Sequence, residues 1–169
     1  MNVTFTKTAE RRYRVSVEGP GLMASFMEPA PGYDTRLPHD MAHFVVEREL
    51  RIAGGVFGQL ADGGHANTFR PQGERPRTRV VKRGKRLAEQ RREDAMLSEK
   101  IVGIASRFWN SGAHAAIPAA GVEGVSADDL RRVLRVFDEV SARWSRLRVG
   151  ESMTLAWTGG IRAARQRRA

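Results

Sequence analysis

Apolar and polar positions alternate in two short stretches near the start of the chain. Residues 2–6 and 13–17 are rich in β-forming residues and are joined by the polar segment 7–12, which predicts a β-hairpin. Residues 22–27 follow a Gly-Pro-Gly turn signal, and we expect a third antiparallel strand there. Residues 152–157 have strand character as well, and we expect them to join the same sheet.

Three longer stretches carry helical signals. We predict one helix over residues 38–52, a second over 85–110, and a third from an N-cap at Ser126 to a stop at Gly150. Apolar stripes at helical spacing mark the second and third helices, formed by Leu97, Ile101, Ile104, Ala105 and Phe108, and by Leu130, Val133, Leu134, Phe137, Val140, Trp144 and Leu147. Together these elements predict a single α+β domain over residues 1–161. Its antiparallel sheet of about three to four strands would pack against about three helices.

The composition is that of an ordinary globular protein, with 41% hydrophobic and 28% charged residues. There is no run of about 18 apolar residues, so we expect no membrane-spanning helix. A cytoplasmic protein is the simplest interpretation. The chain contains no cysteine, and a metal site would therefore have to use histidine, aspartate or glutamate.

The net charge of +10 is concentrated in two segments. Residues 70–92 hold ten basic and two acidic side chains, and residues 162–169 hold four basic side chains and no acidic one. Prolines and a glycine interrupt the start of the first segment, so we predict a mobile basic linker at about residues 70–83. The second segment is predicted to be a disordered basic tail.

The predicted helix 38–52 carries the strongest candidate for chemistry. At about 100° per residue, its polar residues His39, His43 and Glu47 fall on one face of the helix. Apolar residues cover most of the remaining surface, which is typical of a buried helix. Two imidazoles and a carboxylate on a buried face need partners, because an unpaired buried polar group is costly.

Two histidines spaced at i and i+4 can present their ring nitrogens to one metal ion. His39 and His43 are therefore candidate ligands of a divalent metal, with zinc the best match. Asp40 occupies the position from which a general base would activate water, although its side chain is one methylene shorter than glutamate. Glu47 would complete the coordination or accept a hydrogen bond from His43. Other candidates for a third ligand are Glu28, Asp62, His65 and His114.

The spacing His39-Asp40-x-x-His43 resembles the HDxxH motif of a family of ubiquinone-biosynthesis proteins, and more distantly the HExxH motif of zincins. The surrounding LPHDxxHxxVE block is similar to that of an uncharacterised bacterial family with no known activity. The HDxxH resemblance covers five residues and implies a metal-dependent hydrolase or lyase acting on a small molecule or peptide. A purely structural role, with the histidines hydrogen-bonded to Asp40 and Glu47, is the alternative interpretation.

A second functional hypothesis rests on the basic segment 70–92. Its cations would contact nucleic acid or an acidic protein partner through Arg75, Arg77, Arg79, Lys82, Arg83, Lys85 and Arg86, making the protein a binding module and not an enzyme. The segment contains no interleaved aromatic residue for base stacking and matches no helix-turn-helix, zinc-finger or RNP pattern. A general enrichment in arginine would produce the same pattern without a function.

Overall fold

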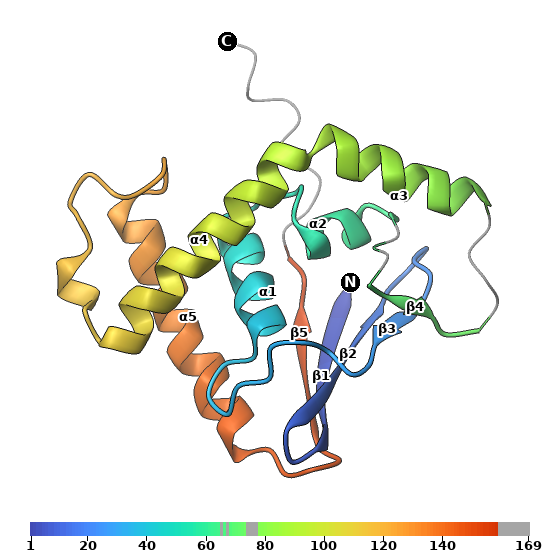
Figure 1. Ribbon diagram of the computed structural model, residues 1–169, viewed down its shortest axis with the longest axis horizontal. Coiled ribbons are helices and arrows are strands. Elements are labelled where there is room, and N and C mark those ends of the chain that lie inside the picture. The colour runs from blue at the N-terminus through green and yellow to red at the C-terminus, as the bar shows by residue number, and fades with distance from the viewer. Residues whose placement is uncertain (65, 67, 74–77, 159–169) are drawn as a thin grey trace.

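The computed structural model describes residues 1–158 apart from 65, 67 and 74–77. It contains a five-stranded antiparallel sheet in the order β4-β3-β2-β1-β5 (Figure 1). The strands are β1 (Asn2–Ala9), β2 (Arg12–Glu18), β3 (Ser25–Met27), β4 (Arg70–Pro71) and β5 (Ser152–Ala156). The helices are α1 (His39–Glu49), α2 (Val56–Ala61), α3 (Thr78–Gln90), α4 (Arg92–Ser111) and α5 (Ala127–Arg146), with a short 3-10 turn η1 (His114–Ala116). The predicted α+β class is confirmed.

The sheet buries one face, as the alternating pattern of the first two strands requires. Val3 and Phe5 of β1 and Val15 and Val17 of β2 are buried, and the residues between them are partly exposed. β5 pairs with β1 in antiparallel register, with Phe5 opposite Met153. The predicted hairpin and the predicted joining of the last strand to the first sheet are both confirmed.

Helix α1 lies at the centre of the protein, between the sheet and the helices α4 and α5 (Figure 1). Its Phe44 ring stands edge-on to Phe5 of β1, with centroids 6.2 Å apart, and to Phe57 of α2, at 5.3 Å. Every residue from 41 to 47 is buried. This is the environment expected for a helix that is apolar on nearly all sides.

Helix α5 begins as its sequence predicts. The Ser126 side chain accepts a hydrogen bond from the backbone N–H of Asp129, and Asp128 lies with Asp129 in the first turn, where a negative charge favours the helix dipole. The apolar stripe on this helix is buried, with Trp144 fully inside the protein.

The structure differs from the sequence prediction in several places, and the short helix α2 is one that was not predicted. It has one strand more than we expected, the two-residue β4, which pairs with the edge of β3. The single helix predicted over 85–110 is two helices, separated at Arg91. The Arg91 guanidinium donates to the Ala53 carbonyl at 2.9 Å and pairs with Asp62 at 2.5 Å, so contacts with distant residues fix the chain where the helices meet.

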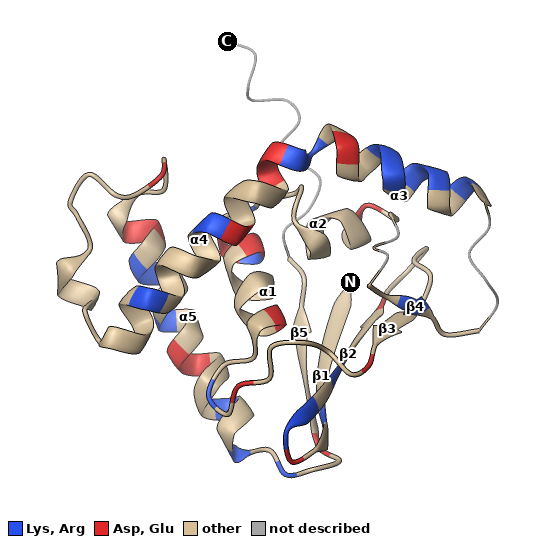
Figure 2. Cartoon of the chain, in the orientation of Figure 1, with Lys and Arg blue, Asp and Glu red and all other residues tan. Residues whose placement is uncertain are grey.

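Part of the predicted basic linker is helical, since α3 starts at Thr78. Figure 2 shows Lys and Arg distributed along α3, at the far side of the protein from α5. Arg75 and Arg77, two of the predicted phosphate-binding residues, lie outside the described residues, as does the predicted tail. None of the described helices is both long and apolar enough to cross a membrane.

Candidate metal centre

The site is built at the N-terminal end of α1, where the loop after β3 turns into the helix. Gly32 lies against His39 in this loop. Its φ of +66° is in the left-handed region, and a Cβ added to it would lie 2.6 Å from the His39 Cβ. The backbone N–H of His39 also donates to the Gly32 carbonyl at 3.1 Å. Glycine at position 32 therefore lets the loop pack directly against the first histidine.

His39 and His43 lie one turn apart, with ring centroids separated by 4.6 Å, and Glu99 of α4 reaches toward both. One ligand atom from each of the three residues lies within 4.8 Å of the others. His43 Nε2 lies 3.4 Å from Glu99 Oε2. Two ligand atoms of a tetrahedral Zn²⁺ site stand about 3.4 Å apart when each metal–ligand distance is about 2.1 Å. His39 and Glu99 are exposed, so small rotations of their side chains would close the remaining gap.

The hydrogen bonds of His43 determine which ring nitrogen faces this group. Nδ1 lies 3.2 Å from Ser98 Oγ, and Ser98 donates its hydroxyl proton to Glu47 Oε1 at 3.1 Å. Because that proton is already used, Ser98 can only accept from His43, which places a proton on Nδ1. The neutral ring then carries its lone pair on Nε2. This atom is buried and has no hydrogen-bond partner.

Glu47, which we predicted as a metal ligand, instead accepts hydrogen bonds from the backbone of α2. Its Oε1 accepts the backbone N–H of Val56 at 3.0 Å, and its Oε2 accepts those of Phe57 at 2.9 Å and Gly58 at 3.3 Å. These groups are the free donors at the start of α2. The fully buried Glu47 therefore caps α2 and orients Ser98, and it is not among the three clustered residues.

The cap depends on a close approach of backbone to carboxylate. The N-cap residue of α2 is Gly55, which has no side chain of its own to cap the helix. A Cβ at position 55 would lie 2.0 Å from the Glu47 Cδ. Glycine is therefore the residue that allows Glu47 to reach the end of α2.

The surroundings of His43 affect its protonation in opposite directions. Burial lowers the pKa of His43, but the Glu47 carboxylate, whose Oε1 lies 3.8 Å from Nδ1, and the negative charges of Glu99 and Asp40 raise it by more. The resulting pKa lies above the ordinary value for histidine. In acid the ring takes a second proton, on Nε2, and a cation at this atom would have to displace that proton.

Asp40 lies beside the histidines but makes its closest contact with β2. Its Oδ2 is in short contact with the Tyr13 hydroxyl, which also lies 2.5 Å from the Pro31 carbonyl. A phenol has one proton and can donate to only one of these acceptors, so a proton on the Asp40 carboxyl would satisfy both contacts. Burial raises the pKa of Asp40, while the hydrogen bond from Tyr13 and the two nearby imidazoles lower it by less. The carboxyl that we predicted as a general base is thus bound to Tyr13.

The other candidate ligands are elsewhere. Glu28 pairs with Arg14, Asp62 pairs with Arg91, and His114 lies in η1. His65 is outside the described residues. Glu99 was not among the predicted ligands, because nothing in the local pattern of α4 distinguishes this exposed glutamate from its neighbours.

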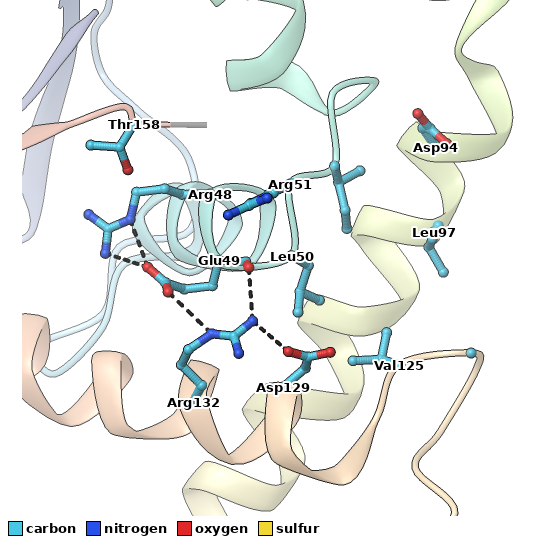
Figure 3. A pocket seen from close by; sticks show the side chains of 12 residues that line it. Arg48, Glu49, Leu50, Arg51, Asp94, Leu97, Val125, Asp129, Arg132 and Thr158 are labelled. Atoms are coloured by element: carbon cyan, nitrogen blue, oxygen red, sulfur yellow. Dashed lines mark hydrogen bonds and ion pairs between the residues drawn. The ribbon is translucent and has the colours of Figure 1, made fainter. Parts of the chain in front are cut away.

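A hollow of about 670 Å³ lies at the opposite end of α1 (Figure 3). Three arginines and three carboxylates line it, and several of these pair with one another. Glu49 bonds Arg48 and Arg132, and Arg132 also pairs with Asp129. None of the predicted metal ligands lines this hollow. Its cations are largely neutralised by its own carboxylates, so it does not present a strong charge to a ligand.

The chain matches no family model, no curated protein and no solved structure. The resemblances of the HDxxH motif and of the LPHDxxHxxVE block therefore stay predictions.

Proposed function

We propose that this protein binds a divalent metal ion through His39, His43 and Glu99, with zinc as the preferred ion. The observation that carries the proposal is the buried Nε2 of His43, which has no hydrogen-bond partner and lies 3.4 Å from Glu99 Oε2. A buried polar atom without a partner is costly, and a metal ion would remove that cost. Two imidazoles and one carboxylate are a donor set that suits zinc.

The residues behind His43 support the same assignment. Ligating histidines commonly donate their other ring N–H to an acceptor, which fixes the ring and raises its basicity. Here the chain His43–Ser98–Glu47 supplies that support, with Ser98 from α4 and Glu47 from the next turn of α1 itself. The capped end of α2 holds Glu47 in place, so the orientation of the ring is fixed before any ion binds.

Three protein ligands leave part of a metal's coordination sphere open, which is the arrangement of catalytic zinc sites. An ion held there would supply Lewis acidity and would lower the pKa of a coordinated water to about 7. We therefore propose that the protein is a metal-dependent hydrolase or lyase that acts on a small molecule or peptide. Asp40 would stabilise the start of α1 through Tyr13, and Glu99 would be the exposed carboxylate ligand.

The experiment is a Zn²⁺ titration of purified, chelator-treated protein against a chromophoric chelator. We expect one tight site per chain in the wild type and a loss of affinity of about 100-fold or more in His39→Ala and Glu99→Gln. Both side chains are exposed, so the variants should fold. Glu93→Gln is the matched control, since it removes the same charge from an exposed position on the same helix.

Wild-type protein that binds no Zn²⁺, Mn²⁺ or Fe²⁺ would refute the proposal and leave the histidines with a structural role. If Glu99→Gln and Glu93→Gln weaken Zn²⁺ binding equally, the ion is attracted by the net charge of the protein and Glu99 is not a ligand. If the site is confirmed, hydrolysis of carboxyl-ester, amide and phosphoester probes should depend on added metal and be lost in Glu99→Gln.

A further inference from the structure

Helix α3 has one face attached to the protein and another covered with cations. Val80, Gly84 and Leu87 lie at i, i+4 and i+7 and form the attached face. Gly84 and Leu87 are buried, and Val80 lines a small cavity with residues of β2 and α2. The cations of the helix are all exposed, namely Arg79, Lys82, Arg83, Lys85 and Arg86. Since the attached face fixes the rotation of the helix, the basic face has a defined direction.

Four of these cations, which we call the basic face, line a hollow of about 480 Å³: Arg79, Lys82, Arg83 and Arg86. They lie at i, i+3, i+4 and i+7, so they fall within about 100° of helix circumference and span about 10 Å along the axis. Within the described part of the chain, none of the four forms an ion pair. Of the three arginines that line the hollow beside α1, Arg48 and Arg132 pair with carboxylates, so that hollow supplies its own counter-charges and the basic face does not.

We infer that the basic face of α3 binds the phosphate backbone of double-stranded nucleic acid. Each strand of a duplex carries one phosphate per about 3.4 Å of axis, so a row of four cations over about 10 Å can meet several phosphates of one strand. Three of the four are arginines, whose planar guanidinium groups bond phosphate oxygens in pairs. The helix has no aromatic residue for stacking on unpaired bases, so contacts to a duplex backbone fit it best.

The attached face also argues against a membrane as the partner. An amphipathic helix that lies on a membrane inserts an apolar face into the lipid. In α3, Leu87 is buried and Val80 lines the small cavity against β2 and α2, and none of the exposed residues of the helix is a large hydrophobic one. Binding through the basic face alone would be independent of base sequence, because phosphates carry no sequence information.

The experiment is a fluorescence anisotropy titration of the whole protein with a labelled DNA duplex of mixed sequence, at several salt concentrations. One variant changes the four residues of the basic face to glutamine. The matched control changes Arg11, Arg135, Arg143 and Arg146 to glutamine, which removes the same charge from exposed positions in the β1–β2 turn and on α5; both elements lie away from α3 (Figure 2). All eight side chains are exposed, so both variants should fold, and thermal denaturation checks that they do.

The wild type should bind the duplex at low salt and weaken about 100-fold between about 50 and 200 mM salt, if four phosphates are contacted. The variant of the basic face should bind about tenfold or more weakly and should lose about three to four units of the slope of log K against log salt. Its affinity for Zn²⁺ should not change, because the two sites share no residue.

Three results would overturn the inference. The first is wild-type protein that does not bind the duplex at low salt. The second is an equal loss in the variant and the control, which would mean that net charge alone attracts the duplex. The third is binding to vesicles of anionic phospholipid in the absence of duplex binding, which would assign the basic face to a membrane surface.

Discussion

Glu47 offers the sharpest test of how the site is built, because a cap and a metal ligand respond differently to the same substitution. In Glu47→Gln the shape of the side chain is kept and one oxygen becomes an NH₂ group. Each carboxylate oxygen accepts two hydrogen bonds, one from Val56 and Ser98 and the other from Phe57 and Gly58. Either orientation of the amide therefore loses two acceptor contacts and sets donors against donors.

The magnitude follows from those two contacts. A hydrogen bond to a charged group contributes about 1.5–3 kcal/mol, so losing two should lower the free energy of unfolding by about 3–6 kcal/mol. Glu47 is fully buried, and water cannot replace the lost partners. The loss is large beside a total stability of about 5–15 kcal/mol.

The assay is urea denaturation followed by tryptophan fluorescence, with a chelator present throughout so that no metal contributes. Glu99→Gln is the control, because its carboxylate is 69% exposed and should change the free energy of unfolding by less than about 0.5 kcal/mol. If Glu47→Gln fails to fold, Gly55→Ala tests the same contact without a change of charge, since its Cβ would press on the carboxylate. A Glu47→Gln protein that keeps its stability in chelator but loses Zn²⁺ affinity would refute the cap and favour a ligand.

Three further outcomes follow from the geometry of the site. Gly32→Ala should weaken Zn²⁺ binding more than Gly21→Ala does. Both glycines have φ near +70°, but only a Cβ at position 32 would contact His39. Equal effects of the two substitutions would show that Gly32 does not position His39. Ser98→Ala should lower Zn²⁺ affinity by about 10–100-fold in a chelator-competition assay, because it removes the hydrogen-bond acceptor that orients the His43 imidazole. Unchanged affinity would show that Ser98 does not support the metal site. The pKa of Asp40 is higher in the folded protein than its value of about 4 in the unfolded chain. Asp40 therefore makes its full contribution to the free energy of unfolding below about pH 4, and that contribution is lost as the pH rises through the folded-state pKa. The melting temperature of Asp40→Asn in chelator should therefore improve relative to wild type as pH rises, and a constant difference would contradict the shift.

The fold could be predicted where local pattern and tertiary environment agree. The continuous apolar surface of α1 predicted burial, and Ser126 marked the start of α5, as the structure shows. The break at Arg91 could not be predicted, because it depends on partners that the fold brings from residues 53 and 62. β4 has only two residues, too few for a pattern.

The candidate site could be predicted only where its residues are close in sequence. His39 and His43 share a helix face, so their spacing was enough to pair them. Glu99 comes from α4, and the hydroxyl beside it on Ser98 is 55 residues from His43 along the chain. The function of Glu47 was hidden for a similar reason, because its partners are backbone donors of α2. Almost every residue has a backbone N–H group, so the identity of the residues in α2 does not reveal which of them bind Glu47.

The pairing of β1 with β5 has a consequence for the order of folding. Thr4 and Thr154 bond each other across this pair, 150 residues apart, whereas β1 meets β2 through a short turn. Closing the long loop between β1 and β5 costs about 2 kcal/mol more in chain entropy than closing the β1–β2 turn. We therefore expect β5 to pair with β1 late in folding, after the helices between them have formed and brought the two strands closer together. Until then one edge of β1 has unpaired backbone groups beside the apolar side chains of Val3 and Phe5. Chains stopped before Ser152 should therefore aggregate through this edge.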